Sequence, residues 1–336
     1  MTRSAPGPTE ICITVDTEFS IGGNFADPRL MPVAEPTVLG SIAGKEHGLG
    51  FLLDSLREFG MRATFFVETL QTTYFGDEPM GEIARRIARA EQDVQLHLHP
   101  CWLHYEAAAN GPTESAPDDS CGGRTDAELS HFFKTGLAAF ERWGLPRPIA
   151  VRAGNFQADM QFYHAADRFG FGLSSNVALA VEPSADPRLR LAGGRHRFGR
   201  VLELPVLSYF YPLGPLRRLR ALAITACTVA EIVSVLRQAR AQGISPVVVL
   251  THPHEFIKRT DLRYQKLRRN RINQARFRDL LGFLHRNPND FVVRPISAIS
   301  DNTGIDGYRD ATISVSAATA LARIAENGVN DRIWWY

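Results

Sequence analysis

The sequence predicts an α/β fold in which parallel strands form a barrel, and three observations support this prediction. Short apolar and β-branched runs alternate with amphipathic stretches along most of the 336 residues. This alternation is typical of a parallel sheet whose strands are joined by right-handed helical crossovers. Seven or eight such units in one chain favour a barrel, with an open doubly wound sheet as the alternative. The glycines form no Gly-x-Gly-x-x-Gly fingerprint and no phosphate loop, so a nucleotide cofactor has little support.

The expected strands are short apolar runs, and they cover residues 11–15, 62–67, 94–99, 149–152, 170–174, 201–206, 247–251 and 291–293. The expected helices carry apolar residues at helical spacing, and they cover residues 50–59, 80–91, 125–143, 160–169, 229–242 and 273–285. Two stretches rich in glycine, proline or polar residues, 19–48 and 111–123, are predicted to be loops.

Hydrophobic residues make up 44% of the chain, which is sufficient for a large core. We expect one domain with a flexible N-terminus at 1–9, a barrel over 10–299 and a C-terminal extension at 300–336. The extension ends in the strongly apolar sequence Ile333-Trp334-Trp335-Tyr336, which we expect to pack onto the barrel.

The charges nearly balance, with 38 Lys and Arg against 36 Asp and Glu, so the chain as a whole gives no signal for nucleic acid. One stretch, residues 258–278, holds nine Lys or Arg and one acid, Asp261. We interpret it as the solvated outer face of a helix and expect no nucleic-acid partner. A clamp for phosphate or another polyanion is the alternative.

No run of about 18 apolar residues is present, so no membrane span is expected. Residues 1–10 lack the apolar region of a secretory signal, and the four cysteines form no Cys-x-x-Cys pair. These features favour a cytoplasmic protein without a disulfide framework.

Reactive side chains come directly after four of the expected strands or at their ends. They are Asp16 and Glu18 after the first, His97 and His99 at the end of the third, Arg152 and Asn155 at the fourth, and His252, His254 and Glu255 after the seventh. The carboxyl ends of parallel barrel strands meet on one rim, where catalytic groups collect. Residues two apart on a strand share a face, so each pair of acids or histidines is expected to point into one pocket.

A carboxylate and two imidazoles, with one position left for water, are the ligands of a catalytic zinc site. Glu18, His97 and His99 are the candidate ligands, and zinc is the expected ion. A further carboxylate can act as general base and a further histidine can protonate a leaving amine. His99 and His254 are also candidates for orienting the histidine before them.

The segments that carry these residues resemble the polysaccharide deacetylase superfamily, the NodB homology group of carbohydrate esterase family 4. They are Thr14-Val15-Asp16-Thr17-Glu18, the strand at 62–67, His97-Leu98-His99-Pro100-Cys101, Arg152-Ala153-Gly154-Asn155, Leu202-Glu203-Leu204-Pro205 and Leu250-Thr251-His252-Pro253. The resemblance runs over residues 11–297 and implies a distorted barrel of about seven parallel strands.

The resemblance also implies roles for individual residues. Asp16 would be the general base, oriented by Arg152, and His252 would be the general acid. Glu18 would replace a metal-binding aspartate, shifted by one position, and His97 would be the first metal-binding histidine.

This sequence departs from the family pattern at the second metal-binding histidine, where Cys101 stands. His99 or His104 could take its place, or Cys101 itself could complete the metal site. The Asp-x-Glu and His-x-His-Pro motifs mark a divergent branch. Asn155, His254, His104 and Glu203 are further candidates for substrate contacts or for support of the ligands.

The predicted function is metal-dependent removal of an N-acetyl group from an amino sugar or a glycan precursor. A hydrolase of small cyclic amides is one alternative. A catalytically inactive, deacetylase-like protein that binds glycans or serves as a scaffold is another, favoured by the missing second histidine.

Overall fold

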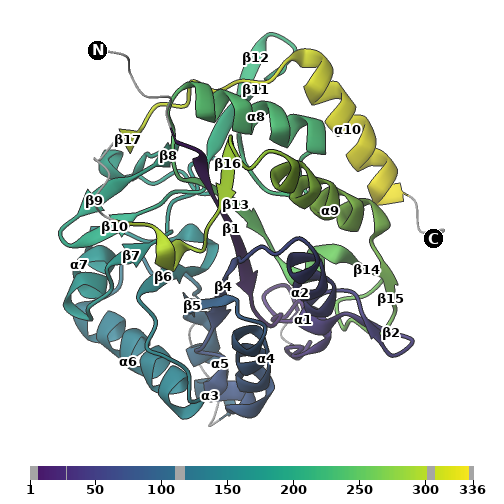
Figure 1. The fold of residues 1–336 in the computed structure, drawn as a ribbon. Coiled ribbons are helices and arrows are strands. Elements are labelled where there is room, and N and C mark those ends of the chain that lie inside the picture. The colour runs from purple at the N-terminus through teal and green to yellow at the C-terminus, as the bar shows by residue number, and fades with distance from the viewer. Residues whose placement is uncertain (1–6, 28, 110–117, 301–306, 333–336) are drawn as a thin grey trace.

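A curled, mostly parallel sheet of nine strands forms the centre of the protein, and helices surround its outer face (Figure 1). The computed structural model describes residues 7–27, 29–109, 118–300 and 307–332. The fold is a mixed α/β single domain in which the sheet forms a half-barrel, as the sequence predicted. None of the helices in these ranges is long and apolar enough to cross a membrane.

The strands lie next to one another across the sheet in the order β13 (Val247–Thr251), β1 (Thr9–Thr17), β4 (Thr64–Glu68), β5 (Asp93–Leu98), β6 (Ala150–Ala153), β7 (Leu173–Ser174), β10 (Val201–Glu203) and β9 (His196–Phe198). The ninth strand, β16 (Phe291–Val293), pairs with the start of β1. A single parallel bridge between Val206 and Val248 connects the segment after β10 to β13 at one point.

Two details correct the expected barrel. The sheet has nine strands instead of about seven, and β9 runs antiparallel to β10. The reason is a tight turn between the two strands, where Gly199 adopts a positive φ of 62° that costs little for glycine. The predicted strand at 201–206 accordingly ends at Glu203, and the one at 170–174 is reduced to β7.

Successive side chains along each strand point to opposite faces of the sheet, and they contribute to two separate hydrophobic cores. In β1, Ile11, Ile13 and Val15 pack with the helices, whereas Cys12 joins Phe66 in a second cluster inside the curl. Both faces of a parallel sheet are buried in this way, which explains why β1 and β13 are almost entirely apolar. Continuing the same alternation places Asp16 on the inner side, at the end of β1.

The helices are α1 (Pro36–Leu39), α2 (Leu49–Glu58), α3 (Thr72–Phe75), α4 (Glu78–Arg89), α5 (Cys101–Ala109), α6 (Asp126–Arg142), α7 (Met160–Arg168), α8 (Val229–Ala241), α9 (Arg271–Arg286) and α10 (Ala317–Arg332). All six predicted helices are present, with ends shifted by at most two residues. Local chemistry fixes several starts: Thr125 and Glu128 form a capping box at α6, which satisfies backbone N–H groups that the helix itself cannot.

The sequence did not predict four short hairpins or antiparallel pairs, nor helices α1, α3, α5 and α10. The pairs are β2 (Ser41–Ile42) with β3 (Lys45–Glu46), β11 (Ser208–Leu213) with β12 (Leu216–Ala221), β14 (Ile257–Arg259) with β15 (Leu267–Arg269), and β8 (Gly193–Gly194) with β17 (Gly307–Tyr308). The stretch 19–48 is therefore only partly a loop, because α1, β2 and β3 lie within it. Four 3-10 turns complete the described structure: Gly154–Phe156, Pro187–Leu189, Pro253–Phe256 and Ile296–Ala298.

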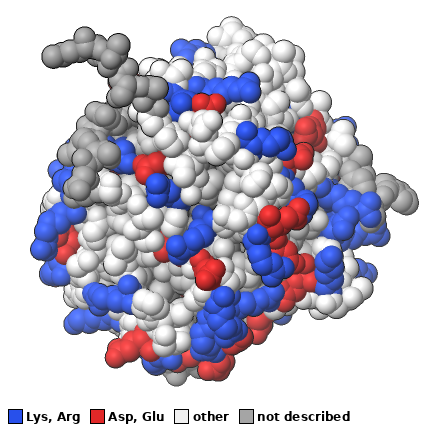
Figure 2. Space-filling model, viewed as in Figure 1, with Lys and Arg blue, Asp and Glu red and all other residues white. Residues whose placement is uncertain are grey.

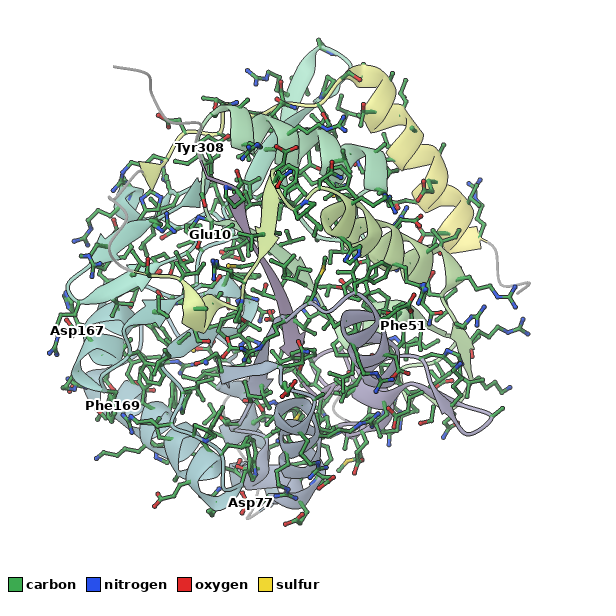
Figure 3. All side chains as sticks on the ribbon, in the orientation of Figure 1. Glu10, Phe51, Asp77, Asp167, Phe169 and Tyr308 are labelled. Atoms are coloured by element: carbon green, nitrogen blue, oxygen red, sulfur yellow. The ribbon has the colours of Figure 1, made fainter. Side chains whose placement is uncertain are left out.

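The C-terminal part of the chain returns to the barrel. Tyr308, which is labelled in Figure 3, follows the described part of the barrel. Its hydroxyl accepts hydrogen bonds from the backbone N–H groups of Thr312 and Ile313, at 2.6 and 2.9 Å. Helix α10 then carries Glu326, which pairs with Arg276 of α9 at 2.6 Å. Part of the basic stretch 258–278 is thus engaged within the protein. The apolar sequence 333–336 lies outside the described residues.

Candidate functional site

The ends of five neighbouring strands meet on one edge of the sheet. The parallel register pairs Thr17 with Val67, Glu68 with His97, and His97 with Arg152. On the other side of β1, Val15 pairs with Thr251. The side chains at and just beyond these positions are therefore brought together, although they are up to 238 residues apart in the sequence between Asp16 and His254.

Glu18, His97 and His99 form a compact cluster. The Oε2 atom of Glu18 lies 2.6 Å from His99 Nε2 and 3.3 Å from His97 Nε2, and the two Nε2 atoms are 3.1 Å apart. His97 is almost fully buried, whereas Glu18 keeps about a quarter of its side chain exposed at 24%. The cluster is thus closed on one side and open to solvent on the other.

Neighbouring groups orient both imidazole rings. His97 Nδ1 donates to the carbonyl oxygen of Arg152 at 2.9 Å, and His99 Nδ1 donates to Asp119 Oδ2 at 2.7 Å. Asn155 also donates to that carboxylate oxygen, at 2.8 Å. With Nδ1 occupied as a donor, Nε2 is the ring atom that is left to face Glu18 and a metal, which is the arrangement typical of histidines that bind metal.

These donor atoms fit a divalent metal. Ligands of a tetrahedral zinc ion lie about 2.0–2.2 Å from the metal and hence about 3.3 Å from one another. Two of the three distances in the cluster are close to that value, and the third is shorter. Burial opposes the charge of Glu18, but His99 and His97 hold its pKa well below the ordinary value, so the carboxylate is ionised as a ligand must be.

A second group of potential ligands overlaps the first and comprises His99, Cys101 and Asp119. Burial and the nearby Asp119 carboxylate raise the pKa of the Cys101 thiol well above its usual range. The thiolate is the form that binds metal, so this environment disfavours Cys101 as a ligand. Within the described residues, the geometry favours His99 as the second histidine.

Asp16 is held by a buried arginine. Arg152 Nη1 donates to Asp16 Oδ1 at 2.6 Å, and its other nitrogens donate to the carbonyl and hydroxyl oxygens of Ser175 at 2.9 and 2.7 Å. The Arg152 side chain is fully buried and Asp16 is nearly so. The guanidinium is therefore fixed on three sides, and it fixes in turn the orientation of the carboxylate.

His252 stands on the opposite side of Asp16. Its Nδ1 donates to Glu255 Oε1 at 3.3 Å, and its Nε2 lies 3.9 Å from Asp16 Oδ2. The other Glu255 oxygen accepts hydrogen bonds from the Thr251 hydroxyl and the His252 backbone N–H, at 2.7 and 3.0 Å. Burial lowers the pKa of His252, but the contact with Glu255 outweighs it and raises the pKa to about 9.

His254 behaves differently from His252. Burial and the positive charge of His252 lower its pKa to about 4. The two rings lie with centroids 5.0 Å apart and planes tilted by 35°. His254 is thus neutral at pH 7, whereas His252 is protonated.

A cavity of about 410 Å³ opens over the cluster. Glu18 and His99 line it together with Asp119, Asn155 and His254. The cavity is therefore large enough for a sugar-sized ligand, with the candidate metal ligands at one wall.

Comparison with solved structures identifies the fold. The protein superposes on a Mycobacterium smegmatis protein that has been provisionally named a polysaccharide deacetylase. The match covers 87% of this chain and 89% of the other, with a TM-score of 0.50 and 17% sequence identity. The chain shares its fold with that protein.

More distant structures come from carbohydrate esterase family 4. They include an esterase from Streptomyces lividans (12% identity, 83% of this chain and 89% of the other, TM-score 0.41) and a pseudoenzyme from Bacillus anthracis (10% identity, 93% and 70%, TM-score 0.45). No protein-family model matches the sequence, and no curated protein matches it.

Two residues predicted for the site, Glu203 and His104, lie apart from these contacts. Glu203 is fully buried, and its carboxylate accepts hydrogen bonds from the Ser174 hydroxyl and the Asn176 and Val177 N–H groups, at 2.5 to 3.1 Å. His104 lies on α5 beside Tyr105 and belongs to neither group of potential ligands among the described residues.

Two acids of the site were not predicted from the sequence. Glu68, at the end of β4, accepts the His99 backbone N–H at 3.2 Å, and Asp119 binds the His99 ring. The search for reactive side chains at strand ends would have found Glu68 if the expected strand at 62–67 had been extended by one residue. Asp119 comes after a polar stretch without periodicity, and only its acidic neighbour Asp118 marks it in the sequence.

Proposed function

We propose that this protein is a metal-dependent hydrolase that removes an N-acetyl group from an amino sugar or a glycan. The observation that carries the proposal is the Glu18–His97–His99 cluster, which lies beside a carboxylate fixed by an arginine and a histidine paired with an acid. Together they supply the ligands, the base and the acid that amide hydrolysis requires. The deacetylase fold supports the same conclusion.

Glu18, His97 and His99 would hold the metal, and zinc suits two imidazoles and a carboxylate. When bound, zinc polarises a carbonyl oxygen and lowers the pKa of water. Asp119 and the Arg152 carbonyl keep the two histidine rings in the orientation needed for binding.

Asp16 is the proposed general base. Its Oδ1 atom is occupied by Arg152 at 2.6 Å, which leaves Oδ2 to accept a proton from the attacking water. Arg152 is itself held by Ser175, so the Asp16 carboxylate cannot change its orientation without breaking buried hydrogen bonds.

His252 is the proposed general acid. Glu255 occupies Nδ1 and keeps the ring protonated at neutral pH, so that the proton on Nε2 is available. Nε2 lies on the side of Asp16. The proposed base and acid are therefore close neighbours, with 3.9 Å between Asp16 Oδ2 and His252 Nε2.

Cys101 stands where the family pattern has its second histidine, and this departure is the reason to consider an inactive protein. The geometry favours the enzyme because His99 brings a second imidazole nitrogen to the cluster, 3.1 Å from that of His97. A glycan-binding protein without activity would be the conclusion if purified protein held no stoichiometric divalent metal. The cytoplasmic location stays a prediction.

The decisive experiment measures acetate release from N-acetylglucosamine oligomers by zinc-loaded protein. Asp16→Asn should retain the fold and the zinc but lower the rate by about two to four orders of magnitude, as expected for loss of a general base. Asp167→Asn is a matched control, because this acid pairs with Arg200 on the surface. Unchanged turnover in Asp16→Asn would overturn the assignment of the base.

A further inference from the structure

The hairpin formed by β11 and β12 carries an apolar tip and, behind it, cations. Leu213 pairs with Leu216 across the turn, and their exposed fractions are 44% and 54%. The next pair, one step from the tip, contains Arg217, and the pair after it joins Tyr211 to Arg218. Apolar and basic side chains are thus arranged in layers along the hairpin.

The charge of the hairpin is of one sign. Residues 208–221 contain three arginines and no acid. Arg217 lies over the Phe210 ring at 4.3 Å, and Arg220 lies over the Tyr211 ring at 5.5 Å. Over the part of the chain that the structure describes, Arg217 and Arg218 form no ion pair with a carboxylate.

Helix α10 extends this surface with an apolar outer face. Leu321 and Ile324 are 65% and 45% exposed, whereas Arg323 and Asn330 are buried against the rest of the protein. A surface helix usually has the opposite arrangement, with apolar residues inward and polar residues outward. On the face of the molecule that Figure 2 shows, the upper edge, where the hairpin and the start of α10 lie, is mostly white.

The hairpin and the helix form one continuous surface. The segment that leads into α10 runs beside β11, where Val315 N–H donates to the Phe210 carbonyl at 3.0 Å. Arg323 of α10 lies over the Tyr211 ring at 4.5 Å. We name this surface the hairpin–helix patch and define it by Leu213, Leu216, Arg217, Arg218, Leu321 and Ile324.

A second copy of the chain fits this patch poorly. Two-fold symmetry would pack the patch against its own copy, which would bring the arginines of both copies into one interface with no acid in the patch to pair with them. An anionic partner avoids this repulsion.

We propose that the hairpin–helix patch binds the surface of an anionic lipid bilayer. Exposed leucines ahead of arginines match the depth profile of a membrane interface, where hydrocarbon lies beneath negatively charged headgroups. Tyr211, which is paired with Arg218, is of the amphipathic type enriched at that interface. This proposal is independent of the hydrolase activity, since no residue of the patch belongs to the candidate site.

The test is flotation of the purified full chain with vesicles of phosphatidylcholine, with or without phosphatidylglycerol. The protein should float only with the anionic vesicles, and added salt should weaken binding. Arg217→Gln with Arg218→Gln should reduce the partition coefficient about fivefold for each charge removed. Leu213→Ser with Leu216→Ser should reduce it by about tenfold or more.

Matched controls remove equivalent groups elsewhere. Arg29→Gln with Arg57→Gln deletes two exposed arginines, 89% and 81% accessible, and Val181→Ser deletes an apolar residue that is 51% exposed. Both should bind vesicles like the parent, and thermal unfolding verifies that all variants are folded. Equal binding to neutral vesicles, or unchanged binding of the patch variants, would refute the proposal. Self-association that the leucine variants abolish, without vesicle binding, would assign the patch to a second copy instead.

Discussion

Two histidine pairs with the same spacing, His97-Leu98-His99 and His252-Pro253-His254, have different arrangements in the structure. In the first pair the two Nε2 atoms converge to 3.1 Å around the Glu18 carboxylate. In the second pair, the Glu255 carboxylate forms an ion pair with His252 and none with His254. The pKa values consequently separate to about 9 for His252 and about 4 for His254.

The difference arises from the course of the backbone beyond each strand. His97 lies within β5 and His99 one residue beyond its end, so both remain on an extended backbone before α5 begins. β13 ends at Thr251, and Pro253 starts a 3-10 turn that brings Glu255 back to His252. The same spacing therefore suits metal binding in one place and acid chemistry in the other.

The largest expected effect concerns metal binding by the first pair. His97→Ala should abolish stoichiometric zinc and lower activity by about three orders of magnitude or more, because the metal supplies several kcal/mol of stabilisation. His254→Ala should retain zinc, since its ring is outside the cluster. Metal analysis of the two purified variants tests this. Equal zinc loss in both would show that the pairs do not differ as proposed.

The second prediction separates the members of the second pair. His252→Ala should lower the rate by about two to four orders of magnitude, as expected for loss of a general acid. The parent should lose activity as the pH rises through about 9, where His252 gives up its proton, and His252→Ala should lack this alkaline limb. If His254→Ala alone loses the limb, the acid is His254.

Much of the site can be predicted from alternation along strands. Asp16, His97, Arg152 and His252 stand at strand ends, where the register of a parallel sheet brings them to one rim. The pairing of Asp16 with Arg152 was expected from the family resemblance, and the register of the strands is consistent with it. Glu203 shows its limit, because the carboxylate of a strand-end residue can be taken up by nearby backbone N–H groups instead.

The role of Asp119 and the position of α10 depend on contacts that no periodic pattern in the sequence indicates. Asp119 reaches His99 from a polar loop, and its partner is 20 residues away. Helix α10 was missed because its buried residues include Arg323 and Asn330 while Leu321 is exposed, the reverse of the pattern used to recognise helices. Ion pairs with α8 and α9 decide its position instead, as between Arg323 and Glu231 at 3.1 Å.

The third prediction tests the support of the first pair. Asp119→Asn should weaken zinc binding by about 10- to 100-fold, the usual cost of losing a group that orients a metal-binding histidine. The rate at saturating zinc should change much less. Competition with a chelator measures the affinity, and Asp118→Asn next to it is the control, since it pairs with Arg124 and not with His99. Equal affinities of the two variants would remove Asp119 from the site.

The smallest effect is expected at the support of the second pair. Glu255→Gln keeps the shape of the side chain but removes the charge that raises the His252 pKa. Burial then acts with less opposition and lowers that pKa, so the alkaline limb of the rate profile should move to lower pH.

Because the pKa of His252 falls in Glu255→Gln, the rate of hydrolysis should decrease at higher pH and not at lower pH. At pH 6 the parent and Glu255→Gln should hydrolyse at similar rates, because His252 remains largely protonated in both. At pH 8 the variant should be slower by about tenfold, the effect of a two-unit fall in pKa towards neutrality. Rates measured across this range at saturating zinc distinguish the shift from a general loss of activity. A uniform decrease at every pH would mean that Glu255 holds the turn at Pro253–Phe256 and does not tune His252.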